Sequence, residues 1–222
     1  MIRFKVPAVI TRRVVSALLV AFGSGIVFML MLIEFDHLTS TEEFCTTCHS
    51  MELAAVPYRE SSHYKPTSGV RATCGDCHVS EGVIAATFDH VMGTKDLVKQ
   101  LFGPDYDNPV VNLLHLPDAA FHSRQWFRDR DSATCGRCHV REAIAGSRAD
   151  TAKIHREDAE GKSCIDCHIN LVHRKVPGEK TFKRDAWNRM IEQEYGLEEG
   201  MAEKILNGEA EPPEIAVAAD GG

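Results

Sequence analysis

Four copies of the motif Cys-x-x-Cys-His constrain the fold of this chain more than any other feature of its sequence. They lie at residues 45–49, 74–78, 135–139 and 164–168 and contain all eight cysteines of the 222 residues. No cysteine is left over for a disulfide, a structural zinc site or a catalytic thiol. Any fold of the chain therefore has to place four similar cysteine–histidine segments.

The spacing inside each motif is that of a covalent attachment site for haem c. Two thiols separated by two residues form thioethers with the vinyl groups of one haem, and the adjacent histidine binds the iron as proximal ligand. A single motif would also fit a zinc site or a redox dithiol. Four motifs that use every cysteine instead favour four covalently bound haem c groups. The expected thioether residues are Cys45, Cys48, Cys74, Cys77, Cys135, Cys138, Cys164 and Cys167, and the expected proximal ligands are His49, His78, His139 and His168.

A long apolar segment precedes the motifs. Val14 to Ile33 is a run of 20 residues without a charge, which is the length that crosses a membrane as a helix. Basic residues dominate before this run and acidic residues after it, so residues 1–13 are expected in the cytoplasm and the rest of the chain outside. A cleaved signal peptide is the alternative, but its apolar region would be shorter. We expect a single-pass anchor (14–33) in a bacterial inner membrane and a periplasmic haem domain.

The chain beyond the anchor is acidic. The sequence has 25 Lys and Arg against 32 Asp and Glu, and four of the basic residues precede the anchor. The external part therefore carries a net charge of about −11, which argues against nucleic acid as a partner because such binding needs a basic face. The same charge favours a redox partner with a basic docking patch.

The motif spacing indicates an internal repeat. Cys45 and Cys74 are 29 residues apart, and so are Cys135 and Cys164. We expect two di-haem modules in a mainly α fold with irregular loops. The haems supply buried apolar surface and their bonds hold short segments of chain in place, so a large apolar core is not needed. The predicted regions are module 1 (34–110), module 2 (111–178), and an amphipathic helix with a disordered tail (179–222).

Apolar periodicity predicts four helices beyond the anchor, at Ser80–Phe102, Asp118–Asp131, Val140–Glu160 and Lys180–Leu206. Asn207–Gly222 is predicted to be disordered because it is rich in Pro, Gly and acidic residues. Within the anchor, Ala17, Ala21 and Gly25 form a line of small residues that would let two anchor helices pack, so a homo-oligomer is a second option beside contact with membrane lipid alone.

The second axial ligand decides what each haem does, since two histidines give a closed iron that only moves electrons. His63 and His155 lie at similar offsets inside the two modules, and His173 follows the last motif by five residues. We expect these three as distal ligands, with His122 in reserve and His37 and His115 at the surface. In the first motif Met51 follows His49 closely, and either residue is a candidate ligand for the first iron.

These features resemble the NapC/NirT/NrfH family of membrane-anchored tetrahaem cytochromes c. The resemblance covers roughly Val14 to Arg174 and rests on the anchor, the motif order and three local stretches. These are the first motif with Met51, the stretch Ser68-Gly-Val-Arg-Ala-Thr-Cys74, and the last motif with His173-Arg174. The resemblance implies oxidation of a membrane quinol (menaquinol or ubiquinol) and electron transfer to a periplasmic reductase.

The resemblance also implies a quinol pocket beside the first haem, lined by a lysine and an acidic residue after the second motif. The acidic position falls on Asp96 and the lysine position on His90, with Lys95 nearby. A carboxylate or an imidazole there would accept protons from the quinol. Three alternatives stay open: a relay without a quinone site, a quinone reductase fed by a periplasmic oxidase, and a small-molecule reductase with an open haem.

Overall fold

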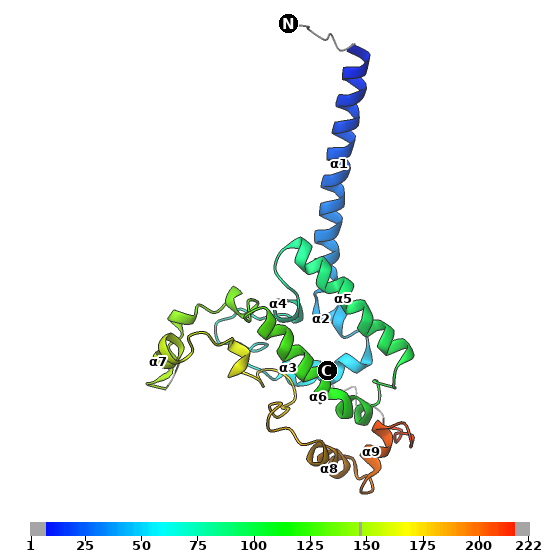
Figure 1. Ribbon diagram of the computed structural model, residues 1–222, viewed down its shortest axis with the longest axis vertical. Coiled ribbons are helices and arrows are strands. Elements are labelled where there is room, and N and C mark those ends of the chain that lie inside the picture. The colour runs from blue at the N-terminus through cyan, green and yellow to red at the C-terminus, as the bar shows by residue number, and fades with distance from the viewer. Residues whose placement is uncertain (1–7, 147, 216–222) are drawn as a thin grey trace.

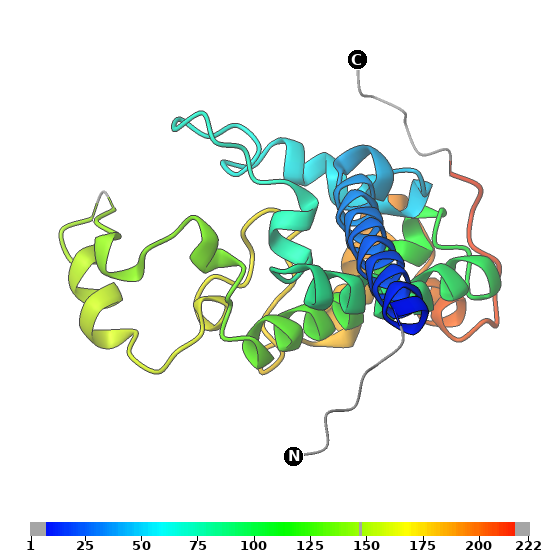
Figure 2. The same cartoon turned by 90° about the horizontal axis from the view of Figure 1, so that it is seen from above.

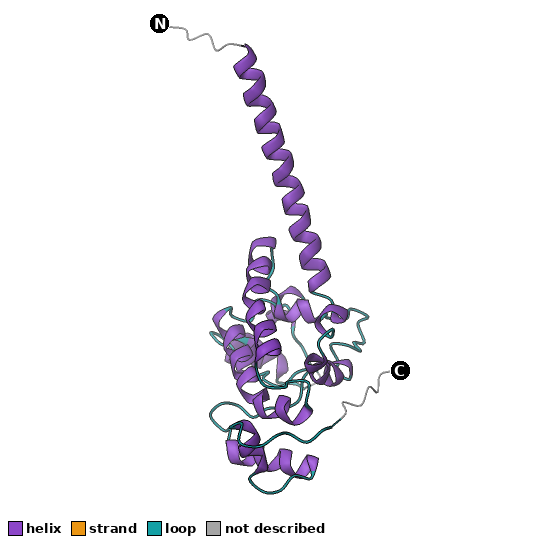
Figure 3. Ribbon diagram, turned by 90° about the vertical axis from the view of Figure 1, so that its right-hand side faces the viewer, coloured by secondary structure: helices purple, strands orange, loops and turns teal. Residues whose placement is uncertain are grey.

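The computed structural model describes residues 8–146 and 148–215, and these residues form helices and loops without any strand (Figure 3). The expectation of a mainly helical fold with one N-terminal apolar helix is therefore confirmed. The longer helices are α1 (Ala8–Thr39), α3 (His49–Arg59), α5 (Val83–Phe102), α6 (Pro109–Asp129) and α8 (Arg184–Tyr195). The short elements are α2 (Glu42–Cys45), α4 (Cys74–His78), η1 (Cys135–Arg137), η2 (Arg141–Ala143), α7 (Thr151–Lys153), η3 (Ile154–Asp158), η4 (Cys164–Asp166) and α9 (Met201–Leu206).

The helix α1 stands away from the rest of the molecule (Figure 1). Among the described residues it is the one helix that is long and apolar enough to cross a membrane, over Thr11–Thr39. Its large apolar side chains, such as Leu19 and Phe22, are exposed in the isolated chain, as a lipid-facing surface requires. The helix continues past the predicted end at Ile33, and Thr39 lies where it enters the haem domain. Residues 1–7 of the predicted cytoplasmic segment lie outside the described residues.

The helix α5 lies at the base of α1, and α6 lies below α5 in the view of Figure 1. The predicted helix at Ser80–Phe102 matches α5. The next predicted helix began too late, because α6 starts at Pro109 rather than at Asp118. Asn108 caps this start, since its side-chain oxygen accepts hydrogen bonds from the amides of Val110 and Val111.

The predicted helix at Val140–Glu160 is wrong. This segment reaches away from the rest of the haem domain (Figure 2) and contains only the short elements η2, α7 and η3. Gly146 interrupts it with a φ of 54°, and an added Cβ there would lie 2.5 Å from the Thr151 side chain. A left-handed backbone at a glycine ends regular helix, which explains the break.

The C-terminal part packs against α6, at the end of the molecule far from α1 (Figure 1). The predicted helix at Lys180–Leu206 is two helices, because Gly196 and Gly200 have φ values of 64° and 83°. The buried cluster contains Val110, Val111, Leu113, Leu114, Val176, Trp187, Ile191, Ala202 and Ile205. Disorder was predicted from Asn207 onward, which is wrong for 207–215. Asn108 donates a 2.7 Å hydrogen bond to the carbonyl of Pro213, and residues 216–222 lie outside the described part.

Candidate functional site

The second, third and fourth cysteine–histidine motifs each form one short helical turn, while the first runs from the end of α2 to the start of α3. In the second motif the Thr73 hydroxyl accepts from the Asp76 amide, and the Asp76 carboxylate accepts from the Thr73 amide. The fourth motif repeats this reciprocal cap with Ser163 and Asp166. Such a cap satisfies amides that a short turn leaves unpaired. The sequence pattern Ser/Thr-Cys-x-Asp-Cys-His therefore fixes the geometry of both turns.

The second motif also needs its glycine. The Gly75 amide donates a 3.2 Å hydrogen bond to the carbonyl of Ser40, just after α1. A Cβ at Gly75 would lie 2.6 Å from the Ser40 Cβ, so any side chain would push the turn away from α1. This contact ties the second motif directly to the end of the anchor helix.

The first cysteines of neighbouring motifs lie side by side. The thiols of Cys45 and Cys74 form a hydrogen bond, which lowers the pKa of Cys45 to about 7 and raises that of Cys74. The thiols of Cys135 and Cys164 also form a hydrogen bond, and burial is the main cause that raises the pKa of Cys135 to about 11. Each pair of motifs thus brings two attachment points together, in the same way in both halves of the sequence.

Three pairs of histidine rings face one another at almost equal distances. The ring centroids are 6.2 Å apart for His63 and His139, 6.0 Å for His78 and His173, and 6.1 Å for His155 and His168. A metal ion bonded to one nitrogen of each ring at roughly 2 Å would hold the ring centres about 6 Å apart. The spacing in all three pairs therefore fits an iron ion with two axial imidazoles.

The surroundings of the rings support the same interpretation. Desolvation by the surrounding chain, and secondarily the nearby His173, lowers the pKa of His78 to about 4, although both residues are exposed at the surface of the chain. Burial also lowers the pKa of His63 and of His173. Nδ1 of His63 is buried without a hydrogen-bond partner within the chain. Rings that stay neutral can bind a metal ion, so the donor set fits haem iron.

The ring pairs join the two halves of the sequence. His63 precedes the predicted boundary at 110/111 and pairs with His139 after it, while His78 pairs with His173. His173 is held in place by a hydrogen bond between its Nδ1 and the carbonyl of Ala54, on α3. The distal candidates predicted from sequence thus all lie opposite a proximal histidine.

The first motif differs from the other three, since His49 belongs to none of these ring pairs. His49 begins α3, and Met51 lies one position beyond Ser50, with 46% of its surface exposed. The Ser50 amide donates a 2.8 Å hydrogen bond to Asp107, and its hydroxyl donates to Gln100 on α5. Sequence reasoning did not find these two polar residues, which fix the first motif against α5.

His37, His122 and His115 belong to none of the three ring pairs. His37 and His122 are exposed. His115 is half-buried rather than at the surface, with its ring 5.3 Å from that of Tyr106.

The three predicted quinol-pocket residues point in different directions along α5. His90 Nε2 lies 2.8 Å from the Thr39 hydroxyl and its Nδ1 lies 3.7 Å from Asp36, both at the end of α1. Asp96 is exposed and pairs with Lys99 at 3.4 Å. Lys95 is exposed on another face of the helix. The structure therefore brings His90 to the anchor but does not bring Lys95 or Asp96 into contact with it.

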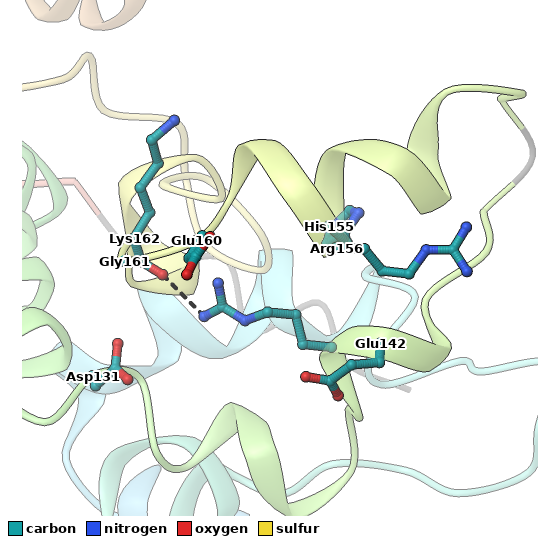
Figure 4. Close-up of a pocket in the computed structure, with 8 residues that line it drawn as sticks. Asp131, Glu142, His155, Arg156, Glu160, Gly161 and Lys162 are labelled. Atoms are coloured by element: carbon teal, nitrogen blue, oxygen red, sulfur yellow. Dashed lines mark hydrogen bonds between the residues drawn. The ribbon is translucent and has the colours of Figure 1, made fainter.

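A cavity of about 770 Å³ lies beside His155 (Figure 4). Arg141 crosses it and donates to the carbonyls of Ala159 and Lys162, at 2.6 and 2.9 Å. Arg156 and Lys162 also line it. Asp131, Glu142 and Glu160 line the cavity as well, so its acidic and basic side chains balance.

Sequence reasoning also missed a buried link between the third and fourth motifs. The hydroxyls of Ser132 and Ser163 lie 2.5 Å apart, and the Ser132 hydroxyl accepts from the Ile165 amide. Asp131 and Ser132 both have positive φ values, of 47° and 51°. Two consecutive left-handed residues other than glycine are costly, and the serine pair holds them in place.

Comparison with known proteins agrees with this geometry. Residues 9–178 match the N-terminal region of the NapC/NirT cytochrome c family. A probable tetraheme cytochrome c-type protein of Nitrosomonas europaea is 33% identical over 172 residues, which are 73% of this chain and 70% of the relative. NapC of Escherichia coli K12 is 34% identical over 163 residues, or 72% of this chain and 81% of that protein. TorC of the same strain is 33% identical over 174 residues, and the match covers 43% of its length. No solved structure matches the chain.

An apolar N-terminal helix and four attachment motifs define a membrane-anchored multihaem cytochrome c. The chain belongs to the NapC/NirT cytochrome c family. It carries four covalently bound haem c groups, as the sequence predicted. The family and the single apolar helix together indicate an inner-membrane protein.

Proposed function

We propose that this protein oxidises a membrane quinol and passes the electrons to a periplasmic reductase. The observation that carries the proposal is the order of the motifs in space. The first motif follows α1 closely, and Cys45 lies beside Cys74 as Cys135 lies beside Cys164. Burial is the main cause that raises the pKa of Cys77, and Asp76 and Cys138 raise it further, so the second and third motifs are also neighbours. The four motifs thus form one row that starts at the membrane.

The residue assignments follow from the same geometry. The eight cysteines form the thioethers, with His49, His78, His139 and His168 as proximal residues. His173, His63 and His155 are the distal ligands of the second, third and fourth haems, because they lie opposite His78, His139 and His168. The first iron, bound through His49 or Met51, is the entry point. Each haem, when bound, takes up and releases one electron at a time.

Quinol oxidation also releases two protons, and groups near the membrane end of the row are suited to take them. His90 is half-buried between α5 and the last turns of α1, and Asp36 lies beside it. An imidazole next to a carboxylate is a proton acceptor near neutral pH. Asp96 and Lys95 lie further along α5, where they would contact the outer part of a bound quinol.

The topology and the partner complete the proposal. The N-terminus lies in the cytoplasm and the haem domain in the periplasm, since Arg12 and Arg13 precede the apolar run and Glu34 follows it. Residues 179–222 contain eleven acidic and five basic residues. A reductase with a basic docking patch is the partner that this charge favours.

The test is direct reduction of the purified, lipid-embedded protein by a reduced menaquinol analogue, followed through the haem absorption bands. Dithionite gives the fully reduced reference. Haem reduction by the quinol within seconds is the expected result. Haems that stay oxidised with the quinol but respond to dithionite would refute quinol oxidation.

Two aspartate variants separate a quinol site from a simple relay. Asp96→Asn should slow reduction by quinol at least tenfold without changing haem content. Asp118→Asn is the matched control, because the two side chains are 65% and 66% exposed and Asp118 lies on α6. Equal rates for the two variants would favour a relay that takes electrons from another membrane protein.

A further inference from the structure

One face of α5 is apolar and has no partner within the described chain. Ile84, Phe88, Val91, Val98 and Phe102 expose between 54% and 84% of their surface. Successive positions differ by three, four or seven residues, which are spacings of one helix face, so these five side chains form a single stripe along the helix. We call it the α5 stripe. Exposed apolar side chains gathered on one face mark an interaction surface.

Part of the opposite face of α5 packs on the protein, although Leu97 and Leu101 on that face are 53% and 65% exposed. Ala86 is buried, and His90 contacts the Phe35 ring and the Thr39 hydroxyl of α1. Near the end of the helix, Gln100 donates a 3.0 Å hydrogen bond to Asp107. The α5 stripe therefore points away from the haem domain.

The contact with α1 fixes how far α5 lies from the hydrocarbon core of the membrane. The apolar run of α1 ends at Ile33, and Thr39 lies six residues later, or about 9 Å further along the helix axis. The headgroup region on each side of a bilayer is roughly 5–8 Å deep. His90 packs edge-on against Phe35, which lies two residues or about 3 Å past Ile33, and is bonded to Thr39. This part of α5 therefore lies between the headgroup region and its outer edge.

We propose that α5 is an interfacial helix whose stripe rests in the lipid leaflet from which α1 emerges. This proposal rests on α1 crossing the membrane and does not depend on quinol oxidation. Lys95 is exposed at the middle of the stripe, and Lys99 is exposed beside it. Their long side chains can reach lipid phosphates while the apolar residues enter the acyl boundary.

The anchor α1 removes most of the free-energy cost of bringing α5 to the lipid surface. A single amphipathic helix binds lipid weakly from solution, but α1 holds α5 at the membrane surface, so its insertion is intramolecular. The lipid surface is the occupant that this continuity with the anchor favours. A second copy of the chain is the competing occupant and is an outcome of the test.

The test uses single cysteine variants of the full-length protein in lipid nanodiscs. Four haems with two thioethers each leave no native thiol, which labelling of the unaltered protein verifies. Phe88→Cys and Val98→Cys place a thiol in the stripe. Ala186→Cys places one on an exposed position of α8, at the end of the molecule far from α1 (Figure 1). A charged maleimide reagent reports access to water.

We expect both stripe thiols to react at least tenfold more slowly than Ala186→Cys, with each rate divided by that of the same variant after denaturation. Equal normalised rates would overturn the proposal. Protection that disappears when nanodiscs carry one protein each would assign the stripe to a second copy and also overturn it. If Phe88→Cys loses haem, Val98→Cys still reports on the same face.

Discussion

The guanidinium group of Arg124 donates a 2.7 Å hydrogen bond to the carbonyl of Val176, and both residues are buried. The same group also donates to the carbonyls of Pro177 and Ile169 and to the side chain of Asn170. One residue of α6 therefore holds the loop that follows the fourth motif. That loop carries His173, so Arg124 positions a proposed iron ligand without touching it.

Replacing Arg124 should loosen this loop. Arg124→Met removes the donor to the buried carbonyl of Val176 and to three partly buried acceptors, and we expect a loss of about 2–4 kcal/mol in unfolding free energy. Arg124→Lys should recover only part of it, because lysine lacks the fork that reaches several acceptors. Chemical denaturation measures both. Arg189→Met, at an exposed position of α8, is the control, and an equal loss there would contradict the role of Arg124.

Each proposed distal histidine should determine the spin state and the carbon monoxide binding of one haem. His63→Ala, His155→Ala and His173→Ala each remove one ring of a facing pair, so one iron in four should become high-spin and bind carbon monoxide. Electron paramagnetic resonance and the carbon monoxide difference spectrum measure this change. His122→Ala should leave the spin states of the haems unchanged. A variant of the three whose haem spin states match those of the unaltered protein would remove that residue from the ligand set.

The stability of the protein should fall in mild acid partly through His115. Burial lowers the pKa of this residue, so the unfolded chain binds the proton more readily than the folded one. Stability is then lost as the pH falls through about 6.5, and the loss levels off below the folded pKa. His115→Gln should reduce the drop in Tm between about pH 7.5 and 5.5. An identical drop in both proteins would show that His115 contributes nothing.

The C-terminal packing should be stabilising but separate from haem binding. Trp187 is buried, and its Nε1 donates to the carbonyl of Leu113 at 2.8 Å. Trp187→Ala should cost about 3–5 kcal/mol through the cavity it leaves, while Trp187→Phe should cost about 1 kcal/mol through the lost hydrogen bond. Denaturant midpoints measure both. Loss of haem from Trp187→Phe would show that the two regions are coupled.

The sequence predicted those features that depend on local pattern. The motifs predict four haems, the uncharged run predicts α1, and the apolar spacing predicts α5. It failed at Val140–Glu160, because Gly146 and its contact with Thr151 override helical periodicity. It failed again at 207–215, where the bond between Asn108 and Pro213 joins residues 105 positions apart. A separation of 52 residues hides the bond between Arg124 and Val176, since no local pattern connects α6 to the loop after the fourth motif.

The exchange of rings between the two halves has a consequence for biogenesis. His63 faces His139 and His78 faces His173, so neither half contains both imidazoles for those irons. Under the proposed ligand assignment, maturation that stopped after the first half would leave the second haem without a sixth ligand. Completion of the proposed ligand sets of these two irons would therefore need both halves of the chain.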